Sequence, residues 1–138
     1  MPGELVLGYD GSECANAALE RALDLAGELG TSVVAVFGYQ PGSALGEEFG
    51  AHADALREVG ERVAQTAVEK ARARGASLEV DIRGERPVEA LLGVAEERDA
   101  RMIVVGSYGE GPIKGAILGS TPHKLLHLSE RPVLVVPV

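Results

Sequence analysis

Short apolar runs alternate with longer stretches of helical periodicity along the whole chain. The runs that read as strands lie at residues 5–9, 32–37, 77–82, 102–105 and 133–136. Between them, apolar residues recur every three or four positions in residues 13–29, about 51–74, 87–98 and 120–127, which is typical of helices. Strands that alternate with helices predict an α/β fold with a mostly parallel sheet. We therefore expect a single doubly wound domain over residues 1–138, with a five-stranded parallel sheet and helices on both of its faces.

Local signals set several boundaries of these elements. Ser12 is a suitable N-cap for the first helix, and Gly30 is a suitable C-terminal stop. Pro87 fits the first position of the third helix. Residues 39–50 contain a proline and several glycines and are expected to form a loop. The run at residues 77–82 alternates polar and apolar side chains, which predicts a half-exposed strand at an edge of the sheet.

Composition argues against several classes of function. A formal net charge of −8 argues against nucleic-acid binding, because phosphate contacts need a basic surface. The single cysteine, Cys14, excludes an internal disulfide and is expected to be a small buried side chain. No segment approaches the roughly 18 apolar residues of a membrane span, and the first residues do not resemble a signal peptide. We expect a cytoplasmic protein with no nucleic-acid or membrane partner.

The stretch from residue 102 to 121 is the strongest candidate for a binding site. An apolar run ends at Gly106, a glycine-rich loop follows, and Ser120 and Thr121 open a helix, which is a recurrent way to hold phosphate. A P-loop is excluded, because Lys114 precedes a glycine and no Ser or Thr follows. A dinucleotide fingerprint belongs after the first strand rather than the fourth, so NAD binding is a weak alternative.

A third pattern fits this stretch. The chain resembles the universal stress protein family, and in particular its nucleotide-binding branch. The ATP-binding signature of that family, G-x2-G-x9-G-S/T, is matched by Gly106, Gly109, Gly119 and Ser120. The resemblance runs from the turn at residues 8–13 to the last strand. It implies the strand order 3-2-1-4-5, an ATP, ADP or AMP ligand with or without Mg²⁺, and a regulatory role in the stress response.

The resemblance also implies roles for particular residues. Asp10 would lie near the ribose or a nucleotide-bound Mg²⁺, and the backbone of Gly38 would meet the adenine edge. The candidate nucleotide-binding residues are Gly8, Asp10, Gly38, Gly106, Ser107, Tyr108, Gly109, Gly119, Ser120 and Thr121. Simpler roles stay open for several of them. In these simpler roles, Asp10 serves solely to stabilise its own turn, the glycines serve solely to close loops, and Ser120 is an ordinary N-cap.

Three positions depart from the pattern common in the family. Tyr108 and Glu110 stand where basic residues are frequent, and Pro122 replaces a residue with a hydroxyl and an N–H group. Lys114 could supply the missing positive charge. These changes weaken the prediction of tight triphosphate binding. A nucleotide-independent, dimeric interaction protein of the same fold is therefore the alternative function.

Catalysis and metal binding are not expected. Asp10 is the only well-placed carboxylate, so we predict at most slow ATP hydrolysis and no catalytic residue. The histidines His52, His123 and His127 are widely placed on expected helices, and we expect none of them to hold a metal. The last strand, Val133–Val136, is apolar and expected at a sheet edge, which together with the family resemblance predicts a homodimer through this strand.

Overall fold

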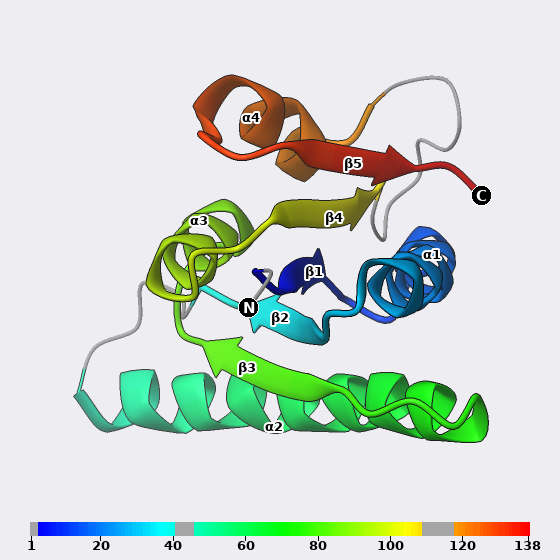
Figure 1. Ribbon diagram of the computed structural model, residues 1–138. Coiled ribbons are helices and arrows are strands. Elements are labelled where there is room, and N and C mark those ends of the chain that lie inside the picture. The colour runs from blue at the N-terminus through cyan, green and yellow to red at the C-terminus, as the bar shows by residue number, and fades with distance from the viewer. Residues whose placement is uncertain (1–2, 41–45, 109–117) are drawn as a thin grey trace.

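A computed structural model describes residues 3–40, 46–108 and 118–138, and it contains one sheet with four helices (Figure 1). The strands are β1 (Leu5–Gly8), β2 (Val33–Gly38), β3 (Glu79–Arg83), β4 (Met102–Gly106) and β5 (Val133–Val136). The helices are α1 (Glu13–Leu29), α2 (Gly46–Ala73), α3 (Pro87–Glu97) and α4 (Ser120–Leu128). The strand order is β3-β2-β1-β4-β5, and all four neighbouring pairs are parallel. The predicted doubly wound α/β fold is confirmed.

Alternate side chains of the central strands supply two separate cores. Leu5 and Leu7 of β1 belong to the core beneath α1 and α2, whereas Val6 belongs to the core beneath α3 and α4. All three side chains are fully buried. A strand with apolar side chains on both faces can bury all of them only if helices cover both sides of the sheet. Figure 1 shows α1 and α3 on opposite faces of the central strands.

The predicted helix boundaries at both ends of α1 are confirmed. The Ser12 hydroxyl accepts a hydrogen bond from the Ala15 N–H at 3.1 Å, which caps the first turn. Gly30 has a φ of 67°, and its N–H donates to the carbonyl of Ala26. This left-handed conformation ends the helix at little steric cost, because glycine has no Cβ. Pro87 is the first residue of α3, as expected.

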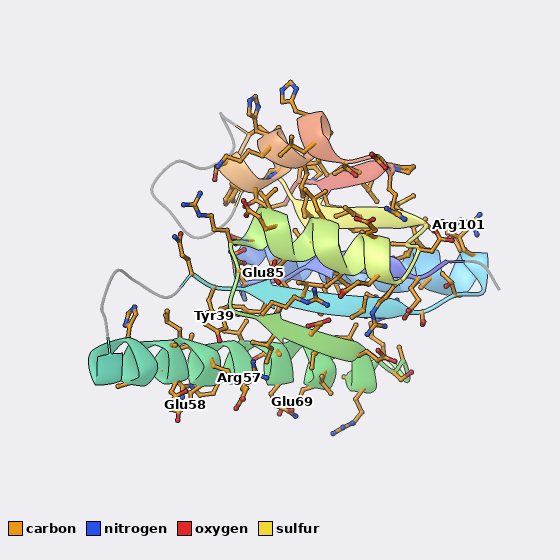
Figure 2. All side chains as sticks on the ribbon, turned by 90° about the vertical axis from the view of Figure 1, so that its left-hand side faces the viewer. Tyr39, Arg57, Glu58, Glu69, Glu85 and Arg101 are labelled. Carbon is orange, nitrogen blue, oxygen red and sulfur yellow. The ribbon has the colours of Figure 1, made fainter. Side chains whose placement is uncertain are left out.

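The start of α2 differs from the prediction. Residues 39–50 were expected to form a loop, but the helix already begins at Gly46. A glycine costs about 1 kcal/mol in a helix, but extending a helix that is already formed adds a hydrogen bond for each residue without the cost of a new nucleus. The 28-residue helix can therefore include Gly46 and Gly50. One side of α2 is buried through the side chains of Ala64, Ala67 and Ala71. Glu58 and Glu69 lie on the side that faces away from the sheet (Figure 2). No helix among the described residues is long and apolar enough to cross a membrane.

The two outer strands of the sheet are β3 and β5, which confirms the edge position expected for the alternating run. The carbonyl oxygens of Pro132 and Val136 accept hydrogen bonds from the N–H groups of Ile103 and Ser107. Backbone groups of a strand point alternately to its two sides, so those of Val133 and Val135 point away from β4. No strand of the described residues pairs with this outer side of β5, which therefore offers N–H and carbonyl groups for a further strand.

Candidate functional site

A cleft of about 410 Å³ lies at the carboxyl ends of the central strands. The cleft lies at the end of β1, which pairs with β2 on one side and with β4 on the other. The order in which successive strands are added to the sheet therefore reverses direction at β1. Ligands of open α/β sheets bind at such switch points. The ends of these three strands, at Gly8, Gly38 and Gly106, line the cleft together.

Most of the residues predicted from the sequence meet in this cleft. Those that line it are Gly8, Asp10, Gly38, Gly106, Tyr108, Gly119, Ser120 and Thr121. Ser107 is not among the lining residues, because its hydroxyl lies 3.5 Å from the Cys14 sulfur and its carbonyl accepts the Gly119 N–H at 2.7 Å. Gly109 lies outside the described residues, as do Glu110 and Lys114. The role of all these residues as nucleotide ligands stays a prediction.

Sequence reasoning missed the apolar wall of the cleft. The further lining residues are Tyr9, Ser12, Ala15, Val36, Phe37, Pro87, Leu91, Val105 and Pro122. Val36 and Phe37 end β2, and Pro87 begins α3. A signal for Val36 and Phe37 was present, since the carboxyl ends of the strands beside the switch point face the crevice. The approach of α3 to β2 joins distant segments and had no such signal. The cleft thus has an apolar side between β2 and α3 and a polar side at α4.

Close packing explains why glycine occupies several of the strand ends. A Cβ on Gly106 would lie 2.6 Å from the Cβ of Cys14, and a Cβ on Gly38 would lie 2.9 Å from the Glu85 carbonyl oxygen. A Cβ on Gly119 would lie 3.0 Å from the Cα of Tyr108. These glycines let helices and loops approach the ends of β2 and β4. They therefore have a structural role whether or not a ligand is bound.

Asp10 stabilises its own turn. Its Oδ1 accepts a hydrogen bond from the Ser12 N–H at 2.9 Å, which is the Asx-type arrangement left open by the sequence. The residue is exposed at the mouth of the cleft. Among the described lining residues, Asp10 is the only acidic or basic side chain. The described part of the cleft therefore offers a negative charge and no lysine or arginine.

The start of α4 supplies hydrogen-bond donors to the cleft. Gly119 is the N-cap, with φ −63° and ψ 163°, and Ser120 is the first helical residue, so Ser120 is not the N-cap that the sequence allowed. The first N–H that bonds within the helix is that of His123, which donates to the Gly119 carbonyl at 3.1 Å. The N–H groups of Ser120 and Thr121 have no acceptor within the helix, and Pro122 has no N–H. Among the described residues these two N–H groups have no hydrogen-bond acceptor, so both could serve an anion at this helix end.

Three titratable groups at the cleft have shifted pKa values, and one of them is Tyr108, whose pKa is raised by its hydrogen bond with Cys14. Burial, and secondarily the Asp10 carboxylate, raises the pKa of Tyr9, whose hydroxyl donates to the Asn16 side chain at 2.5 Å. Burial raises the pKa of the Cys14 thiol, but hydrogen bonds with Ser107 and Tyr108 lower it, and the net shift is downward. Cys14 is fully buried, as expected from the sequence. The cysteine therefore packs behind the cleft rather than lining it.

An open parallel sheet with a cleft at its switch point defines a doubly wound α/β protein. The profile of the universal stress protein family matches residues 1–137. The chain belongs to the universal stress protein family.

Individual members of the family are similar in sequence to this protein over nearly its whole length. Universal stress protein YxiE of Bacillus subtilis is 29% identical, and the match covers 99% of both chains. Universal stress protein Rv1636 of Mycobacterium tuberculosis is 33% identical over 96% of this chain and 94% of its own length. A solved structure of a universal stress protein in complex with cAMP is 31% identical, with a TM-score of 0.72 over 97% of this chain and 96% of that one.

Proposed function

We propose that this protein binds an adenine nucleotide, which is ATP, ADP or AMP with or without Mg²⁺, in the cleft at the ends of β1, β2 and β4. The observation that carries the proposal is the combination of an apolar wall with a helix N-terminus in one cleft. A related universal stress protein of known structure is in complex with cAMP, which supports the same class of ligand. Membership of the universal stress protein family supports a regulatory role in the stress response.

The apolar wall suits a base. Val36, Pro87 and Leu91 lie on this side of the cleft, and the backbone of Gly38 lies beside them. A purine is flat, with apolar faces and polar edges, so it gains from apolar side chains and from main-chain hydrogen-bonding groups at its rim. The cleft volume of about 410 Å³ is within the usual range of about 300–1,000 Å³ for small-molecule sites. We infer that the adenine ring occupies this side.

The start of α4 suits a phosphate. The N–H groups of Ser120 and Thr121 point out of the helix end, where the helix dipole favours negative charge. Asp10 has the opposite effect, because a carboxylate repels an anion unless a cation such as Mg²⁺ lies between them. Taken together, the α4 helix dipole and the Asp10 carboxylate favour the binding of one phosphate at α4. Binding of additional phosphates then depends on a bound cation. This balance is also the reason to keep nucleotide-independent interaction as the second candidate function.

A matched pair of substitutions tests the phosphate contact. Ser120→Pro removes one N–H and the hydroxyl, while the helix is retained, because proline is favoured at the first helical position and the ψ of 163° at Gly119 suits a residue before proline. Ser120→Ala removes only the hydroxyl. A hydrogen bond to a charged group contributes about 1.5–3 kcal/mol, so Ser120→Pro should weaken AMP and ATP binding about 10- to 100-fold.

The assay is calorimetric titration with AMP, ADP and Mg-ATP, together with urea unfolding to show that each variant is folded. Ser120→Ala should lose clearly less affinity than Ser120→Pro. Equal affinities for the two variants would exclude the N–H contact. Absence of both binding heat and a shift in melting temperature at millimolar nucleotide would reject nucleotide binding and favour the interaction protein.

Hydrolysis should be slow at most. Asp10 is the only carboxylate among the described lining residues, and one of its oxygens already accepts the Ser12 N–H. A carboxylate in that position is poorly placed to orient an attacking water as well. Phosphate release from Mg-ATP at several turnovers per second would contradict this expectation.

A further inference from the structure

Two histidines lie one turn apart on the outer side of α4. The ring centroids of His123 and His127 are 5.0 Å apart, and the ring planes are inclined by 69°. Both side chains are exposed. Pro122 and Leu125 of the same helix are buried, and they fix the rotation of α4 so that the two histidines share the face that points away from the core. No metal ligand was expected among the histidines from the sequence, but the geometry of α4 brings these two imidazoles together.

We propose that His123 and His127 form a binding site for a divalent transition-metal ion such as Zn²⁺, Ni²⁺ or Cu²⁺. Imidazole nitrogen is a preferred ligand of these ions. Two histidines four residues apart on one helical face are also the spacing with which zinc-binding helices hold their metal. The first nitrogen to bind holds the ion beside the second, so the pair binds more tightly than two separate histidines.

The separation of the rings fits two ligands on one ion. With metal–nitrogen bonds of about 2.1 Å and a ring centroid about 1.1 Å beyond its nitrogen, two centroids stand roughly 4.5 Å apart at a right angle and roughly 5.2 Å apart at a tetrahedral angle. The observed 5.0 Å lies between these values. The imidazoles therefore need little movement of the helix backbone to bind the same ion.

The C-terminal end of α4 favours a cation, whereas the exposed Lys124, which lies between the two histidines in the sequence, opposes one, and the site is open to solvent. His127 lies in the last turn of α4, where the carbonyl groups of the helix end carry partial negative charge. Among the described residues, no group of three or more histidine, cysteine, aspartate or glutamate side chains is placed to hold a metal. The site is thus a two-ligand site whose remaining positions are filled by water or by a group from another molecule.

The test is titration of the untagged protein with NiCl₂ and, separately, with ZnCl₂ at pH 7.5, followed by calorimetry. The variants are His123→Gln, His127→Gln and the double substitution. His52→Gln is the matched control, because His52 is exposed on a different helix, α2. Each of these substitutions replaces an exposed side chain, so the variants should keep the unfolding midpoint in urea of the unmodified protein.

We expect one ion per chain and a loss of affinity of about tenfold or more in each single variant, with no change in the control. The proposal is overturned if the double variant binds as tightly as the unmodified protein, or if the control loses as much affinity as the His123 variant. Nucleotide is absent from this titration, so its outcome is independent of the proposed function.

Discussion

Replacing Gly106 with alanine should destabilise the protein, although the substitution adds a single methyl group. Gly106 ends β4, and an added Cβ would lie 2.6 Å from the Cys14 Cβ and 2.8 Å from both the carbonyl carbon and the carbonyl oxygen of that residue. Carbon atoms in contact are ordinarily about 3.5–4.0 Å apart, so α1 and β4 must separate by nearly an ångström. Because the obstacle is largely backbone, a change of rotamer cannot relieve the clash.

The expected magnitude follows from overpacking of a core, which costs about 1–3 kcal/mol. We take the upper value of about 3 kcal/mol for Gly106→Ala, because the clash is with main-chain atoms. The entropy of unfolding is about 2.1 cal/mol/K per residue, or roughly 0.29 kcal/mol/K for the 138 residues of this chain. The melting temperature should then fall by roughly 10 °C.

Gly27→Ala is the matched control in the same assay. Gly27 lies within α1, and a Cβ there would meet nothing within 4 Å. Alanine should stabilise this exposed helical position by about 0.5–1 kcal/mol, which raises the melting temperature by roughly 2–3 °C. Both variants are measured by urea unfolding and by thermal melting. A Gly106→Ala protein within about 0.5 kcal/mol of the unmodified protein would refute the packing argument, because such small changes are typical of surface substitutions.

Three further predictions concern the turn, the sheet edge and pH. Asp10→Asn keeps an oxygen for the Ser12 N–H but removes the charge, so calorimetry should show weaker binding of Mg-ATP with AMP binding retained or improved; equal losses for both nucleotides would contradict a charge effect. We predict a homodimer through β5, and Val135→Pro should give a monomer in light scattering, because proline is tolerated at an outward edge position but blocks pairing; a variant that still forms dimers would exclude this interface. The pKa of Tyr9 is raised in the folded state, so the unfolded chain loses this proton first as the pH rises above about 10, and stability falls there. Tyr9→Phe should lessen that fall in urea unfolding between pH 9 and pH 11, and an unchanged slope would show that Tyr9 does not cause it.

Features set by neighbouring residues were predictable from the sequence. The cap at Ser12 and the stop at Gly30 depend on one turn of helix, and both are confirmed. The convergence of the ends of β1, β2 and β4 follows from the strand order, which the family resemblance supplied. The loop expected over residues 39–50 was too long, because residues 46–50 belong to α2. Extending a helix that is already formed adds a hydrogen bond per residue without the cost of a new nucleus, and the local cost of glycine does not include this gain.

Features that join distant segments could not be predicted. Gly106 was assigned to a nucleotide signature, and nothing near it in the sequence indicates that Cys14 packs against it. Ser107 was grouped with the ligands, but its side chain lies by the same cysteine. The sequence allowed Ser120 as an N-cap, whereas the cap is Gly119, because the end of β4 holds the Gly119 N–H through the Ser107 carbonyl. Each of these contacts depends on how α1 and α4 meet β4.

The two edges of the sheet carry different side chains, and this difference affects how many copies of the chain could join through their sheets. On β3, the Arg83 guanidinium binds both carboxylate oxygens of Asp81 at 3.1 Å and also pairs with Glu97, whereas β5 carries only valine and leucine. Two copies related by a twofold axis through their β5 strands would form one continuous sheet with a β3 strand at each end. Charged side chains discourage further strand addition at those ends. If the predicted β5 dimer forms, the joined sheet would therefore end at two subunits instead of extending into a fibre.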